Sequence, residues 1–198
     1  MATDLKLNPK ETIAKAYQLL SRKESWVAEV TASHEKSPQS TLVIRVSSQN
    51  YQFINSDASG RKLMEVVCIG DDSYFFLGEK WEKEKRRDSS NLAELRESFA
   101  KSPESIKNAE FVGKEHFGGT DAAVYQFDFD FNLLKKNLSL DTSVKVPDIK
   151  MKIWISGNNL PIKIESLRET RGLKGLGIER KVEKYNFEEN VKIEVPKI

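Results

Sequence analysis

Cysteine and long apolar runs are nearly absent from this sequence. Cys68 is the only cysteine, so an intrachain disulfide is excluded and cysteine pairing does not indicate a redox compartment. Because apolar residues flank it, Cys68 is expected to be a small buried side chain and not a reactive thiol. No apolar run reaches the roughly 18 residues of a membrane-spanning helix, so none is predicted.

The short motifs of common enzymes are also absent. The sequence has no nucleophile elbow, no Walker sequence and no H-E-x-x-H zinc motif. His34 and His116 stand alone without metal-ligand spacing and are expected to be surface residues. Asp128 and Asp130 would lie about 7 Å apart on one strand face, but an enzyme would require this pair to be buried beside His116 or a metal. We expect both aspartates to be solvated, and we predict no enzyme, no cofactor and no metal.

Charge and length restrict the class of protein further. The 32 basic and 30 acidic side chains nearly cancel and are interspersed, whereas a nucleic-acid partner requires a broad positive surface. We therefore predict no nucleic-acid binding. A chain of 198 residues can bury about 70% of its unfolded surface in one globular domain, and no linker divides it. A single domain over residues 1–198 is predicted.

Residues 123–131 alternate large aromatic and polar side chains with a period of two. In an extended strand, this pattern places the aromatic rings of Tyr125, Phe127, Phe129 and Phe131 on one face. Similar alternation recurs in residues 42–46, 64–68, 149–155 and 191–195. The sequence therefore predicts a large antiparallel sheet with one polar face and one apolar face.

Capping and turn residues divide the chain into elements. A helix is predicted from Pro9 to about Ser21, and a second begins after a cap at Ser89 or Ser90 and ends before Pro103. Turn residues separate eleven predicted strands: 25–34, 39–47, 50–56, 61–70, 73–78, 109–117, 121–131, 147–156, 160–170, 177–187 and 191–195. Residues 80–88 are interpreted as a charged connection, and residues 132–146 as a flexible flap or a short helix.

The dimensions of such a sheet suggest how it folds. Eleven strands make a sheet roughly 50 Å wide, whereas two helices cover about 20 Å of it. Because large open sheets curl, the predicted fold class is α+β: a strongly curved antiparallel sheet of about eleven strands, a half-barrel, enclosing two or three helices. A sheet with too little helix inside leaves an apolar hollow for a hydrophobic ligand. The alternative is an interior filled by the protein's own side chains.

Strand parity selects the residues that would face the hollow. Nine apolar residues are predicted to bind the ligand: Leu42, Ile44, Phe53, Met64, Val66, Phe127, Phe129, Ile153 and Ile164. Residues 133–140 are a candidate lid. Gly172, Gly175 and Gly177 are interpreted as a hairpin tip, whose neighbouring cations could meet an anionic lipid headgroup.

Several stretches together resemble the LolA-like lipoprotein-carrier superfamily, whose relatives include half-barrel bacterial lipoproteins that bind acylated lipids. The resemblance rests on Met64-Glu65-Val66-Val67, Ile69-Gly70-Asp71, Tyr74 and Trp81; on Gly113 to Gly118 and Ala123-Val124-Tyr125-Gln126-Phe127; on Ile153-Trp154-Ile155 and Leu160-Pro161-Ile162-Lys163; and on Val182, Tyr185, Phe187, Val191, Ile193 and Pro196. It implies a curved sheet over helices, a periplasmic or extracytoplasmic bacterial protein, and apolar cargo. The sequence has neither a leader nor a lipid-bearing N-terminal cysteine, so we expect either a cytosolic protein or, as the resemblance implies, a chain whose leader, and any lipid anchor, has been removed.

These observations lead to two functional hypotheses. The first is non-enzymatic binding or transport of lipid, lipoprotein acyl chains or another hydrophobic ligand in the bacterial cell envelope. Its partners would be lipid or an acylated lipoprotein, with transient contact to a membrane surface or envelope proteins, and a monomer is expected. The second is a protein-interaction or envelope-stress sensing module with a filled core and no small-molecule cargo.

Overall fold

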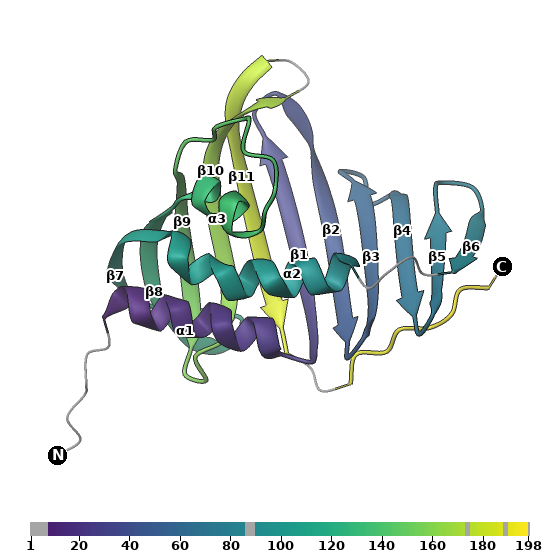
Figure 1. Cartoon of the computed structure of the whole chain (residues 1–198), viewed down its shortest axis with the longest axis horizontal. Helices are drawn as coiled ribbons and strands as arrows, with labels where there is room; N and C mark the ends of the chain where they lie inside the picture. The colour runs from purple at the N-terminus through teal and green to yellow at the C-terminus, as the bar shows by residue number, and fades with distance from the viewer. Residues whose placement is uncertain (1–7, 86–89, 173–174, 188–189, 198) are drawn as a thin grey trace. The chain divides into compact units, whose positions relative to one another are not determined.

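The computed structural model describes residues 8–85, 90–172, 175–187 and 190–197 (Figure 1). It has the predicted α+β class, with one antiparallel sheet of eleven strands and three α-helices. The helices are α1 (Pro9–Arg22), α2 (Ser90–Lys101) and α3 (Phe131–Asn137), with a 3-10 helix η1 (Ser102–Ser105) after α2. Ser89, one of the two predicted caps of the second helix, lies outside the described residues.

The strands pair in a simple order. They are β1 (Ser25–His34), β2 (Ser37–Ser47), β3 (Asn50–Asp57), β4 (Lys62–Ile69), β5 (Asp72–Phe76), β6 (Trp81–Lys85), β7 (Ile106–Phe117), β8 (Thr120–Phe129), β9 (Ile149–Ser156), β10 (Pro161–Gly172) and β11 (Gly175–Asn186). Neighbours in the sheet follow the order β6-β5-β4-β3-β2-β1-β11-β10-β9-β8-β7. Most neighbours in the sheet are therefore also neighbours in sequence, as expected for successive hairpins.

The chain forms two compact units, each built from two separate segments. Unit 1 comprises Met1–Arg22 and Leu95–Ile164, and unit 2 comprises Lys23–Glu94 and Glu165–Ile198. The single domain over residues 1–198 stays a prediction.

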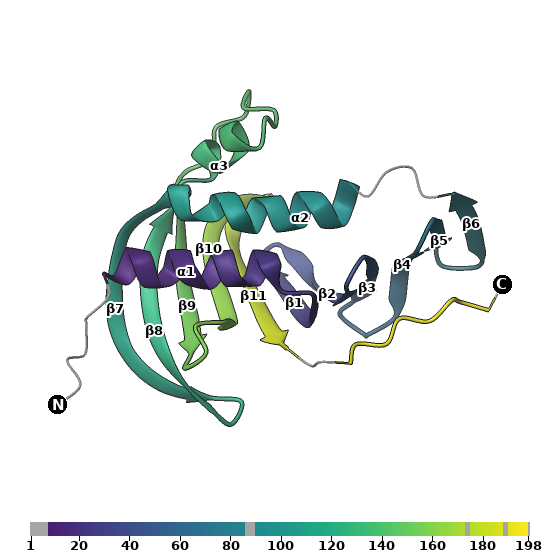
Figure 2. The same ribbon diagram turned by 60° about the horizontal axis from the view of Figure 1, so that its bottom comes forward.

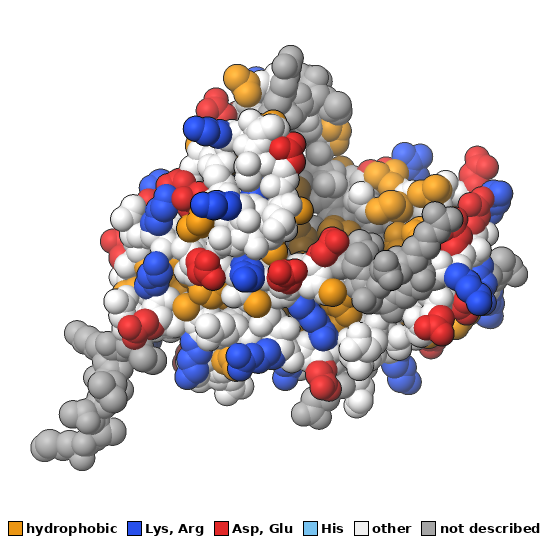
Figure 3. Space-filling model, in the orientation of Figure 1, with side chains coloured by type: hydrophobic (Ala, Val, Ile, Leu, Met, Phe, Trp, Pro, Cys, Tyr) orange, Lys and Arg blue, Asp and Glu red, His pale blue; other side chains and the backbone are white. Residues whose placement is uncertain are grey.

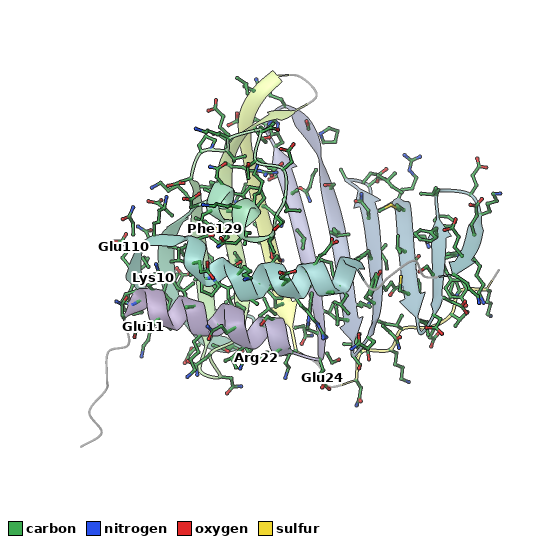
Figure 4. The ribbon with its side chains drawn as sticks, in the orientation of Figure 1. Lys10, Glu11, Arg22, Glu24, Glu110 and Phe129 are labelled. Atoms are coloured by element: carbon green, nitrogen blue, oxygen red, sulfur yellow. The ribbon has the colours of Figure 1, made fainter. Side chains whose placement is uncertain are left out.

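In unit 1, α1 begins as the sequence predicted. The Asn8 side chain accepts a hydrogen bond from the backbone N–H of Lys10 at 3.0 Å, which satisfies a donor of the first turn. The buried side of the helix consists of Thr12, Ile13, Ala16, Tyr17 and Leu20. This side lies against β7, β9 and η1 (Figure 2), whereas Lys10 and Glu11 are exposed (Figure 4). Burial of this apolar stripe holds the helix on the sheet.

Strand β8 of unit 1 has buried residues on both of its faces, which the expected division into one polar and one apolar face did not anticipate. On β8, Phe127 and Phe129 are buried on one face, and Ala122 and Val124 are buried on the other. The second face is covered by Trp154, which forms a cluster with Ala122, Val124 and the partly buried Ile162.

Strand β8 also ends earlier than predicted. The strand stops at Phe129, and Asp130 becomes the N-cap of α3, where its side chain accepts a hydrogen bond from the backbone N–H of Leu133 at 2.9 Å. Phe131 is therefore the first helical residue and does not extend the aromatic face. Capping competes with strand continuation here because aspartate strongly favours the N-cap position.

In unit 2, one end of the sheet is fully buried. A row of cross-strand neighbours, consisting of Trp26, Val46, Tyr51, Cys68 and Ser73, is at most 5% exposed. Cys68 is buried as predicted, with its Sγ 3.3 Å from the Oγ of Ser73. These residues form the floor of the unit 2 core.

The predicted number of strands is correct, but two members differ. Residues 81–85, interpreted as a charged connection, form edge strand β6, where the Trp81 ring packs 5.5 Å from the Phe76 ring. Residues 191–195 alternate as a strand would but form none, although Val191 is buried. Alternation shows that one side of a segment is apolar, and it does not show that a neighbouring backbone is available for pairing.

Candidate functional site

Five of the nine predicted ligand residues lie together on one face of unit 2. Leu42 and Ile44 come from β2, Phe53 from β3, and Met64 and Val66 from β4. The register pairs Ile44 with Phe53 and Phe53 with Val66, and it places Leu42 and Met64 on either side of Asn55. Because directly paired residues point to the same side of a sheet, these five side chains form one surface, which we call the β2–β4 apolar face.

The β2–β4 apolar face is only partly covered. Val66 is 9% exposed, and the other four side chains are half-buried, whereas the adjoining row that contains Tyr51 and Cys68 is fully buried. The Tyr51 and Phe53 rings lie 5.0 Å apart, so the exposed part is continuous with the buried floor. Figure 3 shows hydrophobic side chains gathered over β3, β4 and β5. The face therefore offers accessible apolar surface on a rigid sheet, which is typical of a binding surface.

The remaining four predicted residues lie in the core of unit 1. Phe127, Phe129, Ile153 and Ile164 are at most 6% exposed, and the Phe127 and Phe129 rings meet edge to face at 6.4 Å. Phe129 is labelled in Figure 4. The alternation of side chains along each strand correctly placed these residues on the apolar side of the sheet. It does not distinguish a filled core from an open surface. Their role as ligand contacts stays a prediction.

The opposite face of the same strands carries a chain of polar contacts that the sequence analysis missed. The Arg45 guanidinium donates to the Gln52 Oε1 at 2.8 Å, and Gln52 Nε2 donates to Glu65 Oε1 at 2.5 Å. Lys62 pairs with the other oxygen of Glu65 at 2.5 Å, and its ammonium lies 4.5 Å from the centre of the Phe76 ring. We call these four residues the Arg45–Lys62 ladder. Glu65 is only 7% exposed, so a buried carboxylate is fully partnered here.

Each aspartate of the predicted pair is held in an ion pair. Asp128 pairs with Lys150 at 2.5 Å and accepts a hydrogen bond from Asn108 at 2.8 Å, and Asp130 pairs with Lys107 at 2.8 Å. Both side chains are largely covered, so the expectation that they are solvated is wrong. His116 pairs with Asp121 instead, and the described residues contain no group of three or more histidine, cysteine or acidic side chains that could hold a metal.

These contacts lower the pKa of both carboxyl groups. The pKa of Asp128 is lowered chiefly by the hydrogen bond from Lys150, and then by that from Asn108. The pKa of Asp130 is lowered chiefly by the hydrogen bond from Lys107, and then by the backbone N–H of Leu133. Both groups are therefore charged at neutral pH and serve as structural ion pairs.

Replacing Asp130 with alanine is expected to lower the free energy of unfolding by about 1 kcal/mol, because α3 loses its cap and Lys107 loses its nearer partner. Asp130→Asn should lose less, since asparagine caps equally well without the charge. Urea denaturation of the three proteins at pH 7 measures both changes. An Asp130→Ala protein as stable as the wild type would contradict the capping role.

The same variants test the pH dependence. A carboxyl whose pKa is lowered in the folded state stabilises it above its unfolded pKa, near 3.8, and this contribution is lost as the pH falls through the folded value. Between pH 5 and pH 2, the wild type should therefore lose more stability than Asp130→Asn.

A small polar cavity of about 190 Å³ lies in unit 2, and the sequence analysis did not predict it. It is lined by Ala32, Ser33, His34, Ser37, Pro38, Ser40, Thr170 and Glu179. The Nδ1 of His34 accepts from the backbone N–H of Lys36 at 2.8 Å, so its Nε2 donates to the carbonyl of Thr170 at 3.0 Å. His34 is thus a half-buried bridge between strands and not a free surface residue. The polar lining of the cavity does not suit an acyl chain.

Two other predicted segments have partial outcomes. Of residues 132–146, interpreted as a flap or a short helix, the first part is α3, whose Leu134 is buried in a helix that packs on η1. At the glycine-containing hairpin, residues 173–174 lie outside the described residues, and Arg180 pairs with Glu165 at 3.0 Å. No helix among the described residues has the length and hydropathy needed to cross a membrane.

No protein-family model matches this sequence, and no curated protein is similar to it in sequence. Solved structures do share its fold. The Mycobacterium tuberculosis lipoprotein LppX superposes with a TM-score of 0.61 at 11% identity, over 94% of this chain and 98% of LppX. LprF from Mycobacterium bovis gives a TM-score of 0.60 at 11% identity, over 95% of this chain and 96% of LprF. The chain therefore shares the fold of LppX and LprF.

Proposed function

We propose that this protein binds lipid or lipoprotein acyl chains, without catalysis, on the β2–β4 apolar face. The single observation that carries the proposal is this face itself: five apolar side chains from three adjacent strands, partly open to solvent and continuous with a buried floor. Two further findings support it. The fold is shared with LppX, which is a lipoprotein, and the aspartate pair that a catalytic alternative needs is held in ion pairs.

The likeness to LppX also supports an extracytoplasmic location, since LppX is named as a lipoprotein. We propose that the protein works outside the cytoplasm of a bacterium, where it meets acylated lipids or lipoproteins. Transient contact with a membrane surface or an envelope protein would allow cargo to enter and leave.

The energetics indicate what kind of cargo the face can hold. Burial of apolar surface contributes about 0.8 kcal/mol per CH₂ group, and micromolar affinity requires about 8 kcal/mol. A ligand must therefore bury about ten CH₂ groups, which a long acyl chain supplies and a small polar metabolite does not. The five apolar side chains would select cargo by the length and number of its chains, and Asn55, between Leu42 and Met64 in the register, adds one hydrogen-bonding group to the same face.

The experiment that tests this proposal is organic extraction of the protein, purified from a bacterial periplasm, followed by mass spectrometry of the extract. We expect acyl lipid in stoichiometric amounts. Delipidated protein should then take up a fluorescent fatty acid, with emission rising as the dye enters an apolar site. An extract without lipid, together with no uptake of the fatty acid, would contradict the proposal.

A pair of variants on β3 tests whether the fatty acid binds on the β2–β4 apolar face. Phe53→Lys places a charge in the β2–β4 apolar face and should weaken fatty-acid binding at least tenfold, because a buried ammonium strongly disfavours apolar cargo. Ile54→Lys is the matched control: its side chain is also half-buried, but it points to the other side of β3, beside Glu65. It should bind as the wild type does. Equal losses in both variants would show that the cargo lies elsewhere.

One observation favours the alternative of a protein-interaction module. Phe127, Phe129 and Ile153 are fully packed, so this part of the predicted hollow is filled by the protein itself. A module of this kind would release no lipid on extraction. It would also take up no fatty acid, either as the wild type or as Phe53→Lys. The extraction experiment therefore separates the two functions.

A further inference from the structure

The segment after α3 exposes two aliphatic side chains. In residues 138–148, which we call the α3 loop, Leu140 is 54% exposed and Val144 is 67% exposed. They are the most exposed large aliphatic side chains among the described residues of unit 1. Figure 2 shows α3 and the α3 loop projecting away from α1 and from strands β7 to β9. Solvated aliphatics of this kind gain free energy when they enter another apolar phase.

Hydrogen bonds hold the α3 loop in this shape. The Asn132 side chain makes two of them with Val146: its Nδ2 donates to the carbonyl at 2.6 Å, and its Oδ1 accepts from the backbone N–H at 2.9 Å. The Lys135 ammonium donates to the carbonyl of Val144 at 2.7 Å, and the backbone N–H of Leu140 donates to the carbonyl of Lys135 at 2.9 Å. The exposed aliphatics are therefore presented by a tied loop, and little ordering entropy is lost when they bind.

The charges around the α3 loop have a positive balance. Lys135, Lys136 and Lys145 flank the two aliphatics in the sequence, and Asp141 is the one acidic residue between α3 and Val146. The pKa of Asp141 is lowered chiefly by the backbone N–H of Ser143, so it is charged at neutral pH. Three cations against one anion leave a local charge of +2 beside the apolar side chains.

The acidic residues at the base of the α3 loop offset part of this charge. Lys107 lies 2.8 Å from Asp130 and 3.4 Å from Asp148, so these three groups together carry one negative charge. Asp128 and Lys150, which lie 2.5 Å apart, form a neutral pair. Residues 135–146 themselves keep their charge of +2.

From these observations we propose that the α3 loop is a docking surface for an anionic lipid bilayer, with Leu140 and Val144 entering the headgroup region and the lysines contacting lipid phosphates. A protein partner fits less well, because a specific protein interface buries about 800 Å² on each side, far more than two side chains supply. A bilayer requires no shape complementarity and accepts isolated aliphatics flanked by cations. This inference does not depend on cargo binding by the β2–β4 apolar face.

The first test is sedimentation with vesicles of phosphatidylcholine alone or with 30% phosphatidylglycerol. We expect the wild type to bind the anionic vesicles at least tenfold more strongly than the neutral ones, and to be released by salt. The double variant Leu140→Ser/Val144→Ser should bind anionic vesicles at least tenfold more weakly. Both positions are exposed, so the variant should fold normally, and circular dichroism checks this.

The matched control is Leu63→Ser/Leu77→Ser, on β4 and just after β5, where the two aliphatics are 42% and 71% exposed. This variant should bind the vesicles as the wild type does. Three results would overturn the proposal: equal binding to neutral and anionic vesicles, unchanged binding by the α3 loop variant, or an equal loss in the control.

A second measurement locates the contact. Val144→Cys can be labelled with an environment-sensitive dye, since Cys68 is buried and the native protein should stay unlabelled. We expect the dye emission to shift to the blue when anionic vesicles are added, and no shift for a dye at Leu77→Cys. An unchanged spectrum at residue 144 with bound protein would place the contact elsewhere. Fatty-acid uptake by both variants, measured in parallel without vesicles, reports separately on the proposed function.

Discussion

Replacing Trp154 with alanine is expected to lower the free energy of unfolding by about 3–5 kcal/mol. The Trp154 ring is 2% exposed and forms a cluster with Ala122, Val124 and Ile162. Its removal leaves a cavity beside Ala122, Val124 and Ile162, and these smaller side chains cannot fill the volume of an indole ring. Denaturant titration followed by circular dichroism measures the loss.

Phenylalanine at the same position separates packing from hydrogen bonding. Trp154→Phe keeps most of the ring but loses the Nε1–H donated to Glu115 at 2.7 Å. The loss of stability should be smaller than for alanine. That N–H is the largest cause that lowers the pKa of Glu115, ahead of Lys152, so this pKa should rise toward its ordinary value in the variant. Equal stability of the alanine variant and the wild type would show that Trp154 is not part of the core.

Replacing Ile153 with alanine is the second change with a large expected effect, about 2–5 kcal/mol of unfolding free energy. Ile153 is fully buried in unit 1, opposite Tyr125 in the register of β8 and β9. The same change at Ile44, which is half-buried on the β2–β4 apolar face, should cost less than half as much. Fatty-acid affinity should respond in the opposite order, with the greater loss at Ile44.

This comparison tests the division of the nine predicted ligand residues. If Ile153→Ala costs less than about 1 kcal/mol and abolishes fatty-acid binding, the core of unit 1 opens to cargo, and all nine residues belong to one site. If Ile153→Ala is strongly destabilising but, when folded, binds the fatty acid normally, the site is confined to the β2–β4 apolar face.

Much of the fold could be predicted because its signals are local. The alternation of Tyr125, Phe127 and Phe129 identified β8, and the cap at Asn8 located the start of α1. The boundary at Asp130 was missed because a strand pattern and a helix cap overlap there, and aspartate satisfies both. Strand β6 was missed for a related reason: apart from Trp81, its side chains are charged, as is common for an edge strand that avoids pairing with other molecules.

The candidate site was less predictable than the fold. Parity placed Phe53 and Phe127 equally toward an apolar side, but the depth of each residue depends on what packs against it from distant parts of the chain. One is half-buried in unit 2, and the other is 3% exposed in unit 1. The partners of Glu65 were also beyond prediction, because Gln52 contacts Glu65, and Arg45 contacts Gln52, only when three strands adopt one register.

The Arg45–Lys62 ladder has a consequence for how β2, β3 and β4 assemble. Side chains alternate between the two sides of a strand. A register shift of β4 by one residue would therefore place Glu65 on the apolar side of the sheet and Met64 or Val66 beside Gln52. A carboxylate stranded among hydrocarbons is heavily penalised, whereas a slipped aliphatic side chain alone would be tolerated. The Arg45–Lys62 ladder on one side of the strands therefore disfavours a shifted register. In this way it preserves the β2–β4 apolar face on the other side without contributing a residue to it.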